Sequence, residues 1–128
     1  MAEWRADFTG LEAWQKACDV VEAVYSLTQS FPRHELYGLG GQMRRAAVSM
    51  PTNIAEGYAR RHPRDKGRFY VIARSSGEEL KSLLFLARRL KFAEADSFET
   101  LMGLLDHACR LAHGLIEAAK TWSCSPRG

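Results

Sequence analysis

Residues 36–58, LYGLGGQMRRAAVSMPTNIAEGY, contain the pattern that decides the fold class. Mostly apolar or small residues recur there at steps of three and four, at Leu36, Leu39, Met43, Ala46, Met50, Asn53 and Gly57. These steps place side chains on one face of an α-helix, so the stretch predicts an amphipathic helix. The pattern continues past Pro51, and this proline is therefore expected to bend the helix rather than end it.

Three further segments have the same spacing, at residues 11–28, 69–90 and 101–122. The connections between the segments are short, which places successive helices antiparallel to one another. No segment shows the alternating pattern of a strand. The sequence therefore predicts an all-α protein, an up-down-up-down antiparallel four-helix bundle domain over residues 8–122. Residues 123–128 are expected to form a disordered tail.

Two of the predicted helices begin with the spacing of a capping box. Thr9 is followed three residues later by Glu12, and Asp96 is followed by Glu99. In such a motif the first side chain accepts a hydrogen bond from a backbone N–H of the first helical turn. We therefore expect Thr9 and Asp96 to be the N-caps of the first and fourth helices.

The cysteines and the apolar runs indicate a cytoplasmic protein. Cys18, Cys109 and Cys124 are odd in number, widely spaced and form no CxxC pair, which favours free thiols in a reducing compartment. No run approaches the roughly 20 continuous apolar residues of a membrane-spanning helix. The first residues show no secretory signal pattern. We therefore expect a cytoplasmic location and no membrane association.

The sequence contains no arrangement of residues that is typical of an active site. It has no HExxH, P-loop, GxGxxG or GxSxG motif, and no inward-facing pair of Glu-x-x-His motifs for a di-iron centre. His107 and His113 are six residues apart and fall on different faces of a helix. We therefore predict a non-enzymatic protein without catalytic residues, metal, cofactor or small-molecule substrate.

Polar residues interrupt the apolar faces of the second and third predicted helices. In an antiparallel pair that turns near His62, residues equally far from the turn face each other, so Ser49 lies opposite Ser76 and Arg45 lies near Glu79. We expect an ion pair between Arg45 and Glu79, and a buried, hydrogen-bonded Asn53. Such a network would fix the register of the helices, as a core Asn does in coiled coils. Its expected members are Arg45, Ser49, Asn53, Glu56, Ser76 and Glu79.

Positive charge is concentrated in residues 44–91, which carry a net charge of +8 in a chain whose net charge is +3. The densest group lies around the predicted turn between the second and third helices and comprises Arg60, Arg61, Arg64, Lys66 and Arg68. Tyr58 and Tyr70 flank this group and would offer stacking surfaces. We interpret the group as a surface that binds RNA or DNA through backbone phosphates. The alternative is a structural or protein–protein interaction scaffold whose basic residues only face solvent.

Four sequence motifs, in order, indicate a known family. Residues 44–57, RRAAVSMPTNIAEG, closely resemble the signature of the four-helix bundle proteins encoded in intervening sequences of bacterial 23S rRNA genes. Similar motifs occur at residues 11–17, 31–39 and 73–80. The resemblance implies a homopentamer. The family is similar to the accessory protein of diversity-generating retroelements, a basic pentameric barrel thought to bind nucleic acid beside a reverse transcriptase.

The first and fourth predicted helices carry apolar residues beyond the single line that a lone bundle requires. A second line on the first helix includes Ala17, Val20 and Val24, and one on the fourth includes Leu105 and Ala112. Surface of this kind rarely stays exposed on a monomer. We therefore expect a closed homo-oligomer, and the number of five subunits follows from the resemblance alone.

Overall fold

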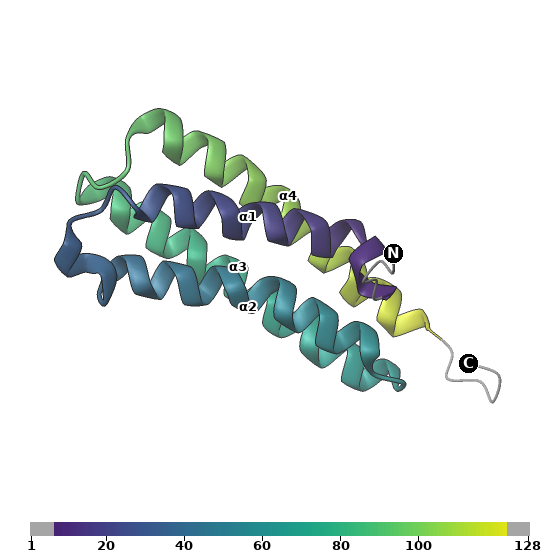
Figure 1. The fold of residues 1–128 in the computed structure, drawn as a ribbon. Helices are drawn as coiled ribbons and strands as arrows, with labels where there is room; N and C mark the ends of the chain where they lie inside the picture. Colours follow the sequence, from purple (N-terminus) through teal and green to yellow (C-terminus); the bar gives the residue numbers. More distant parts are fainter. Residues whose placement is uncertain (1–6, 123–128) are drawn as a thin grey trace, which may run out of the picture.

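The computed structural model describes residues 7–122, which fold into four α-helices preceded and interrupted by two short 3-10 helices (Figure 1). The elements are η1 (Asp7–Gly10), α1 (Glu12–Thr28), η2 (Arg33–Leu36), α2 (Leu39–Ala59), α3 (Pro63–Arg89) and α4 (Ala95–Thr121). Each helix packs against the helices that precede and follow it, and α1 also packs against α4. The predicted all-α four-helix bundle is confirmed. The tail predicted for residues 123–128 lies outside the described residues.

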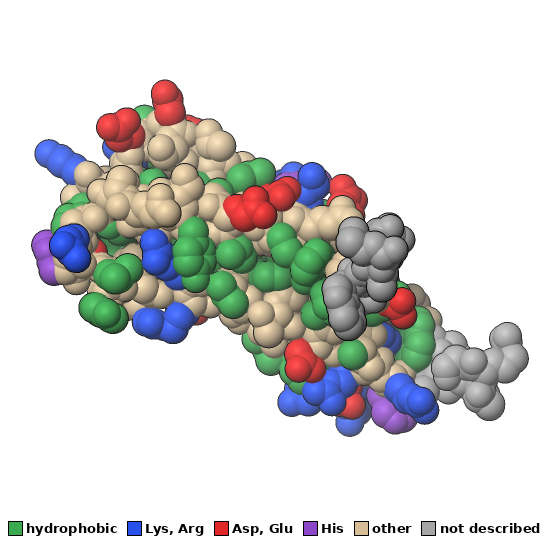
Figure 2. Space-filling view, viewed as in Figure 1, with side chains coloured by type: hydrophobic (Ala, Val, Ile, Leu, Met, Phe, Trp, Pro, Cys, Tyr) green, Lys and Arg blue, Asp and Glu red, His purple; other side chains and the backbone are tan. Residues whose placement is uncertain are grey.

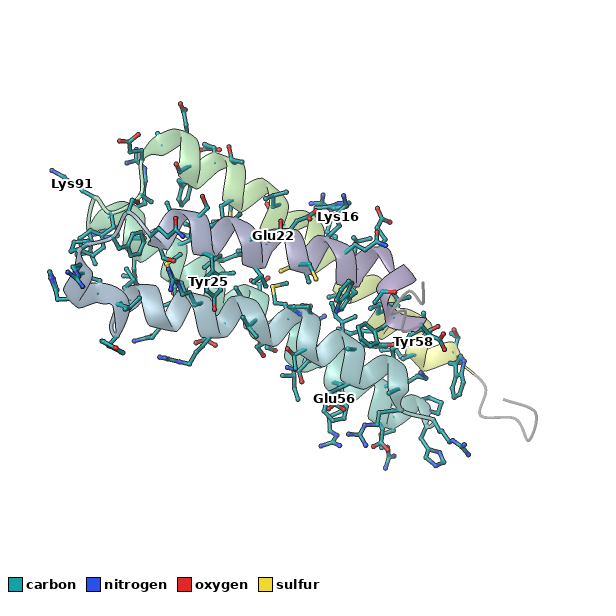
Figure 3. All side chains as sticks on the ribbon, in the orientation of Figure 1. Lys16, Glu22, Tyr25, Glu56, Tyr58 and Lys91 are labelled. Atoms are coloured by element: carbon teal, nitrogen blue, oxygen red, sulfur yellow. The ribbon has the colours of Figure 1, made fainter. Side chains whose placement is uncertain are left out.

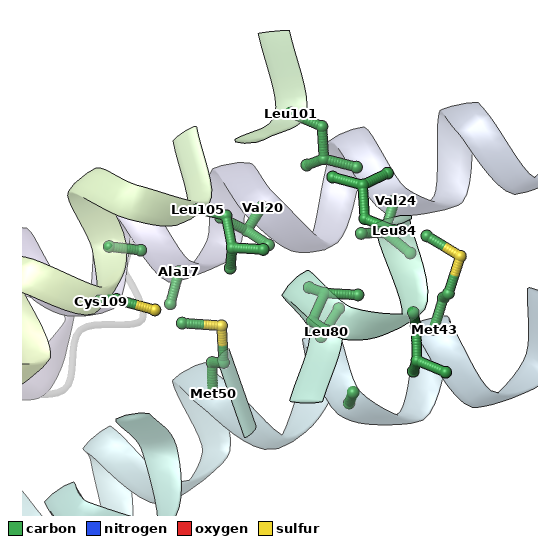
Figure 4. Close-up of a cluster of buried hydrophobic side chains, with 14 of the residues drawn as sticks. Ala17, Val20, Val24, Met43, Met50, Leu80, Leu84, Leu101, Leu105 and Cys109 are labelled. Atoms are coloured by element: carbon green, nitrogen blue, oxygen red, sulfur yellow. The ribbon is translucent and has the colours of Figure 1, made fainter. Parts of the chain in front are cut away.

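The core is formed by aliphatic and sulfur-containing side chains from all four helices (Figure 4). The largest fully buried side chains are Val20, Val24, Met43, Met50, Ile54, Leu80, Leu84 and Leu105. Burying each of these removes apolar surface from water and stabilises the fold by about 1.5–3 kcal/mol. Fully buried alanines lie between them, at Ala17, Ala47, Ala73, Ala87, Ala108 and Ala112, and allow the helix backbones to approach closely.

The second helix passes through Pro51 as the spacing predicts, and it continues to Ala59. It begins at Leu39 rather than at Leu36, because residues 33–36 form η2. A carboxylate oxygen of Glu35 accepts a hydrogen bond from the Leu39 backbone N–H at 2.9 Å, which satisfies one of the unpaired donors at the helix start.

Neither predicted capping box forms. Helix α1 follows Leu11, and α4 follows Glu94, in each case without a side-chain hydrogen bond at the cap. Thr9 lies within η1, whose chain turns back so that the Leu11 N–H donates to the Phe8 carbonyl oxygen. Asp96 lies one residue inside α4, where its charge faces the positive end of the helix dipole.

The additional apolar residues of the first and fourth helices lie mostly inside the bundle. They therefore do not form the exposed apolar surface from which an oligomer was expected. Ala17, Val20 and Val24 are fully buried, as are Leu105 and Ala112. Large exposed hydrophobic side chains occur mainly on α2 and α3, at Val48, Tyr58, Val71, Ile72, Phe85 and Leu86. Figure 2 shows hydrophobic side chains gathered along the boundary of α1 and α2 on the face in view, with Lys and Arg toward both ends. None of the described helices is long and apolar enough to cross a membrane.

Candidate nucleic-acid interface

The predicted basic group lies at one end of the bundle. Helix α2 ends at Ala59 and α3 begins at Pro63, which occupies the first turn of its helix, where a missing N–H is tolerated. The sharp turn places residues 60–68 together beside the N-terminus of the described chain and the end of α4 (Figure 1). We call this surface the arginine end and define it by Arg60, Arg61, Arg64 and Arg68.

Arg60 and Arg68 both lie against the ring of Phe69. Their guanidinium carbons are 4.7 Å and 4.9 Å from the ring centroid, within the range of cation–π contacts. Arg60 also pairs with Glu56 at 3.2 Å, and Arg68 pairs with Asp65 at 4.0 Å. Exposed pairs of this kind contribute only about 0–1 kcal/mol, so the two guanidiniums are positioned by the ring but can exchange a carboxylate for a phosphate.

Arg61 and Arg64 are exposed and have no carboxylate within 4.0 Å anywhere in residues 7–122. Arg61 lies in the connection between the helices, and Arg64 lies in the first turn of α3. Their charge is therefore not neutralised locally. Unpaired guanidiniums that face solvent are available for bidentate contacts with phosphate oxygens.

Lys66 differs from the other members of the predicted basic group. Its Nζ donates to the Tyr58 carbonyl oxygen at 2.9 Å and to the Gly57 carbonyl oxygen at 3.4 Å, which caps the C-terminal end of α2. The ammonium also lies 5.3 Å from the Tyr58 ring centroid and 5.1 Å from the Trp122 ring centroid. Partial burial lowers the pKa of Lys66. Lys66 is thus held against the end of α2 and beside Trp122, and it is only partly exposed.

The two tyrosines that flank the basic group are not equivalent. Tyr70 is only 4% exposed and packs beside Gly57, so the hypothesis that it offers a stacking surface is wrong. Burial and the neighbouring Tyr58 raise the pKa of Tyr70. Tyr58 is 37% exposed and is joined by Trp122, also 37% exposed. The sequence pattern did not single out Trp122, although an antiparallel bundle places the end of the fourth helix beside the turn between the second and third.

The polar residues between α2 and α3 form a directed chain of hydrogen bonds. Asn53 donates from Nδ2 to the Ser49 hydroxyl at 2.9 Å and to the Ser49 carbonyl oxygen at 2.8 Å. The Ser49 and Ser76 hydroxyls are 2.8 Å apart, and Ser76 donates to the Ile72 carbonyl oxygen. Because each hydroxyl has one hydrogen, Ser49 donates to Ser76. The hydrogen bond between Ser49 and Ser76 joins the two helices in the register that the antiparallel geometry predicts.

Three expectations for this network need correction. Arg45 and Glu79 line the same surface groove but form no ion pair within 4.0 Å. Both are exposed, and an exposed pair gains too little free energy to hold two long side chains in one geometry. Asn53 is hydrogen-bonded as expected but only half-buried, and both of its hydrogen bonds go to Ser49 of its own helix. Glu56 pairs with Arg60 outside the network. In residues 7–122 no cluster of three His, Cys, Asp or Glu side chains is placed to hold a metal ion.

These features define the class: an antiparallel four-helix bundle with a hydrogen-bonded α2–α3 core and an arginine-rich end. Residues 9–114 match the family described as 23S rRNA-intervening sequence protein, and the chain belongs to that family. The resemblance carried by the four sequence motifs is thereby confirmed.

A solved structure has the same fold. It is described as a protein with unknown function from the S23 ribosomal protein family from Bacteroides thetaiotaomicron. The two chains superpose with a TM-score of 0.74 at 18% identity, over 82% of this chain and 95% of that one. At this identity the similarity shows the fold alone. No curated protein matches the chain.

Proposed function

We propose that this protein is a non-enzymatic, cytoplasmic, homo-oligomeric module that binds RNA or DNA through backbone phosphates at the arginine end. The observation that carries the proposal is the exposure of Arg61 and Arg64 without a carboxylate partner, next to two further guanidiniums positioned by Phe69. Contacts of this kind recognise phosphates rather than base edges. Binding through the arginine end alone is therefore nearly independent of sequence.

Oligomerisation would strengthen binding that is weak for one subunit. A single arginine end offers four guanidiniums, two of which share their charge with Glu56 and Asp65. Five copies of residues 44–91 would together carry about +40. One polyanion touching several subunits gains affinity through effective concentration without any new type of contact. The pentamer number rests on the resemblance, and the exposed apolar side chains of α2 and α3 support an interface between subunits.

An electrophoretic shift titration with single-stranded RNA and duplex DNA at about 50 and 200 mM salt tests the proposal directly, because phosphate binding falls steeply over that range. The variant Arg61→Gln/Arg64→Gln removes the two unpaired charges and should weaken binding at low salt. The matched control is Arg89→Gln/Arg110→Gln, which removes two exposed charges from the end of α3 and from α4. It should bind more tightly than the first variant. Equal loss in both variants would mean that overall charge, and not the arginine end, determines binding.

The second candidate is a structural or protein–protein interaction scaffold. It is favoured by the exposed apolar side chains of α3, which include Val71, Ile72 and Leu86. The same titration separates the two candidates. If the wild-type protein binds no nucleic acid at about 50 mM salt, the arginine end is a solvated surface and the scaffold function is supported.

A further inference from the structure

A small open pocket lies at the same end of the bundle as the arginine end. Its space is about 140 Å³. Aromatic, basic and aliphatic side chains of α2, α3 and α4, of the residue before α1 and of the residue after α4 line it: Leu11, Tyr58, Lys66, Tyr70, Leu115, Ala118, Ala119 and Trp122. Figure 3 shows Tyr58 at this end, toward the C-terminal part of α4. The space is smaller than the roughly 300–1,000 Å³ of pockets for drug-sized ligands, so it suits a single flat ring system.

The chemistry of the pocket is that of a stacking site with one hydrogen-bond donor. Tyr58 and Trp122 expose more than a third of their surface, and aliphatic side chains line the pocket with them. The Lys66 ammonium lies about equally far from both rings and donates two of its three N–H groups to backbone carbonyls. The third N–H remains for an acceptor on a ligand. A flat ring bearing a carbonyl oxygen satisfies both features.

The position of the pocket indicates what carries that ring. Tyr58 precedes Arg60 by two residues, and Lys66 follows Arg64 by two residues. A nucleotide whose phosphate contacts these arginines therefore has its base within reach of the pocket. Bases in a duplex are paired and stacked and do not reach such a site, whereas bases of a single strand stack readily on aromatic side chains.

We infer that this pocket accepts one unstacked base of a single-stranded nucleic acid bound at the arginine end. The inference rests on the proposed function and adds two properties to it. Single strands bind more tightly than duplexes. Bases with an exocyclic carbonyl oxygen, such as thymine and uracil, bind more tightly than adenine, whose acceptors are ring nitrogens and whose exocyclic amine is itself a donor.

Fluorescence anisotropy with labelled oligo-dT, oligo-dA and a duplex of equal phosphate number tests the inference on the full-length protein. Wild type should bind in the order oligo-dT, oligo-dA, duplex. Trp122→Ala should weaken oligo-dT binding by about tenfold, the loss expected for one stacked base, and leave duplex binding unchanged. Trp122→Phe should retain most of the oligo-dT affinity. The control is Tyr37→Ala, which truncates a 90% exposed aromatic at the opposite end.

Lys66→Met tests the donor separately, with helicity checked by circular dichroism because Lys66 also caps α2. Lys66→Met should remove the preference for oligo-dT, so that oligo-dT and oligo-dA bind with similar affinity. The inference is overturned if wild type binds single strands and duplex equally, or if Trp122→Ala binds oligo-dT as wild type does. Those results would leave phosphate binding at the arginine end intact. Absence of wild-type binding to all three ligands would overturn the proposed function as well.

Discussion

Gly57 of α2 lies directly against the ring of Tyr70 of α3. A Cβ placed at position 57 would be 2.7 Å from Cε1 and 2.8 Å from Cδ1 of Tyr70, and 3.1 Å from the Lys66 carbonyl oxygen. Tyr70 is buried, so its ring has little room to move away. The absence of a side chain at residue 57 therefore sets how closely the two helices approach beside the arginine end.

Gly57→Ala should destabilise the protein by roughly 1–2 kcal/mol. Overpacking costs about 1–3 kcal/mol, and the better helix propensity of Ala returns up to about 1 kcal/mol. Urea unfolding measures the difference. The control is Gly114→Ala in α4, where nothing lies within 4 Å of the added Cβ and the propensity gain should raise stability. If both variants gain stability, the Gly57–Tyr70 contact does not limit helix packing.

A second close contact joins Gly77 of α3 to Cys109 of α4. A Cβ at residue 77 would meet the Cys109 Sγ at 2.5 Å and the Met50 Cε at 3.1 Å. Gly77→Ala and Cys109→Ala should each lower stability, because one adds an atom without space and the other leaves a small void. The double variant should be more stable than the sum of the two losses predicts, since the new methyl fills that void. Purely additive losses in thermal unfolding would contradict the packing described.

Ser49→Ala removes the middle member of the hydrogen-bond chain between α2 and α3. Asn53 and Ser76 each lose one partner, and the expected cost is about 1–3 kcal/mol because Asn53 is half-buried and Ser76 is buried. Ser75→Ala, at an exposed position on α3, is the control and should leave stability almost unchanged. Chemical denaturation of the two variants measures this difference in stability. Equal midpoints would show that the hydrogen bonds of Ser49 contribute no stability.

Lys81 of α3 lies 2.9 Å from Asp106 of α4 and 3.1 Å from Glu78. Partial burial lowers the pKa of Lys81, but the hydrogen bonds to Asp106 and Glu78 outweigh it, and the pKa lies above its ordinary value of 10.5. A raised lysine pKa contributes stability that is complete below the unfolded-state pKa and is lost as the pH rises through the folded-state pKa. Lys81→Gln should be less stable than wild type by about 0.5–1 kcal/mol at neutral pH.

The stability difference between Lys81→Gln and wild type should shrink as the pH passes 10.5 and the ammonium loses its proton. Unfolding curves of both proteins at neutral and alkaline pH measure this difference and cancel the titration of other groups. A difference that stays constant with pH would mean that Lys81 acts through packing of its aliphatic stem rather than through its charge.

The proposed oligomer predicts a mass of about five times 14.4 kDa in light scattering at micromolar concentration. Ile72→Lys/Leu86→Lys places two charges among the exposed apolar side chains of α3 and should lower that mass while helicity is retained. A monomeric mass for wild type would refute the oligomer, and a dimer or tetramer would refute the number of five.

The sequence predicts the helical features that depend on local periodicity and on the antiparallel connections. The passage of α2 through Pro51 and the meeting of Ser49 with Ser76 both follow from these two features. Other contacts depend on where side chains lie in three dimensions. The contact between Gly57 and the Tyr70 ring is one of these. The step of three from Tyr70 to Ala73 places Tyr70 on the buried face of α3, but the close approach of its ring to Gly57 depends on how the two helices pack.

Two further differences have separate causes. One is an exposed pair of charges whose paired and separated arrangements have nearly equal free energy. Arg45 and Glu79 face each other across the helices, but an exposed pair gains too little free energy to fix its geometry. The contact of Lys66 with Trp122 joins α3 to the residue that follows α4, and the two residues are far apart in the chain. It could be anticipated only by tracing which helix ends an up-down-up-down bundle brings together.

That topology has a practical consequence. Since four antiparallel helices return the chain to the side where it started, the beginning of η1, the last turn of α4 and the turn from α2 to α3 lie at the same end of the molecule (Figure 1). An affinity tag or fluorescent protein attached next to Asp7 or next to Trp122 would lie beside the arginine end and would compete with a polyanion for access to it. The connection between α3 and α4, around Glu94, lies at the opposite end and is the better place for a label.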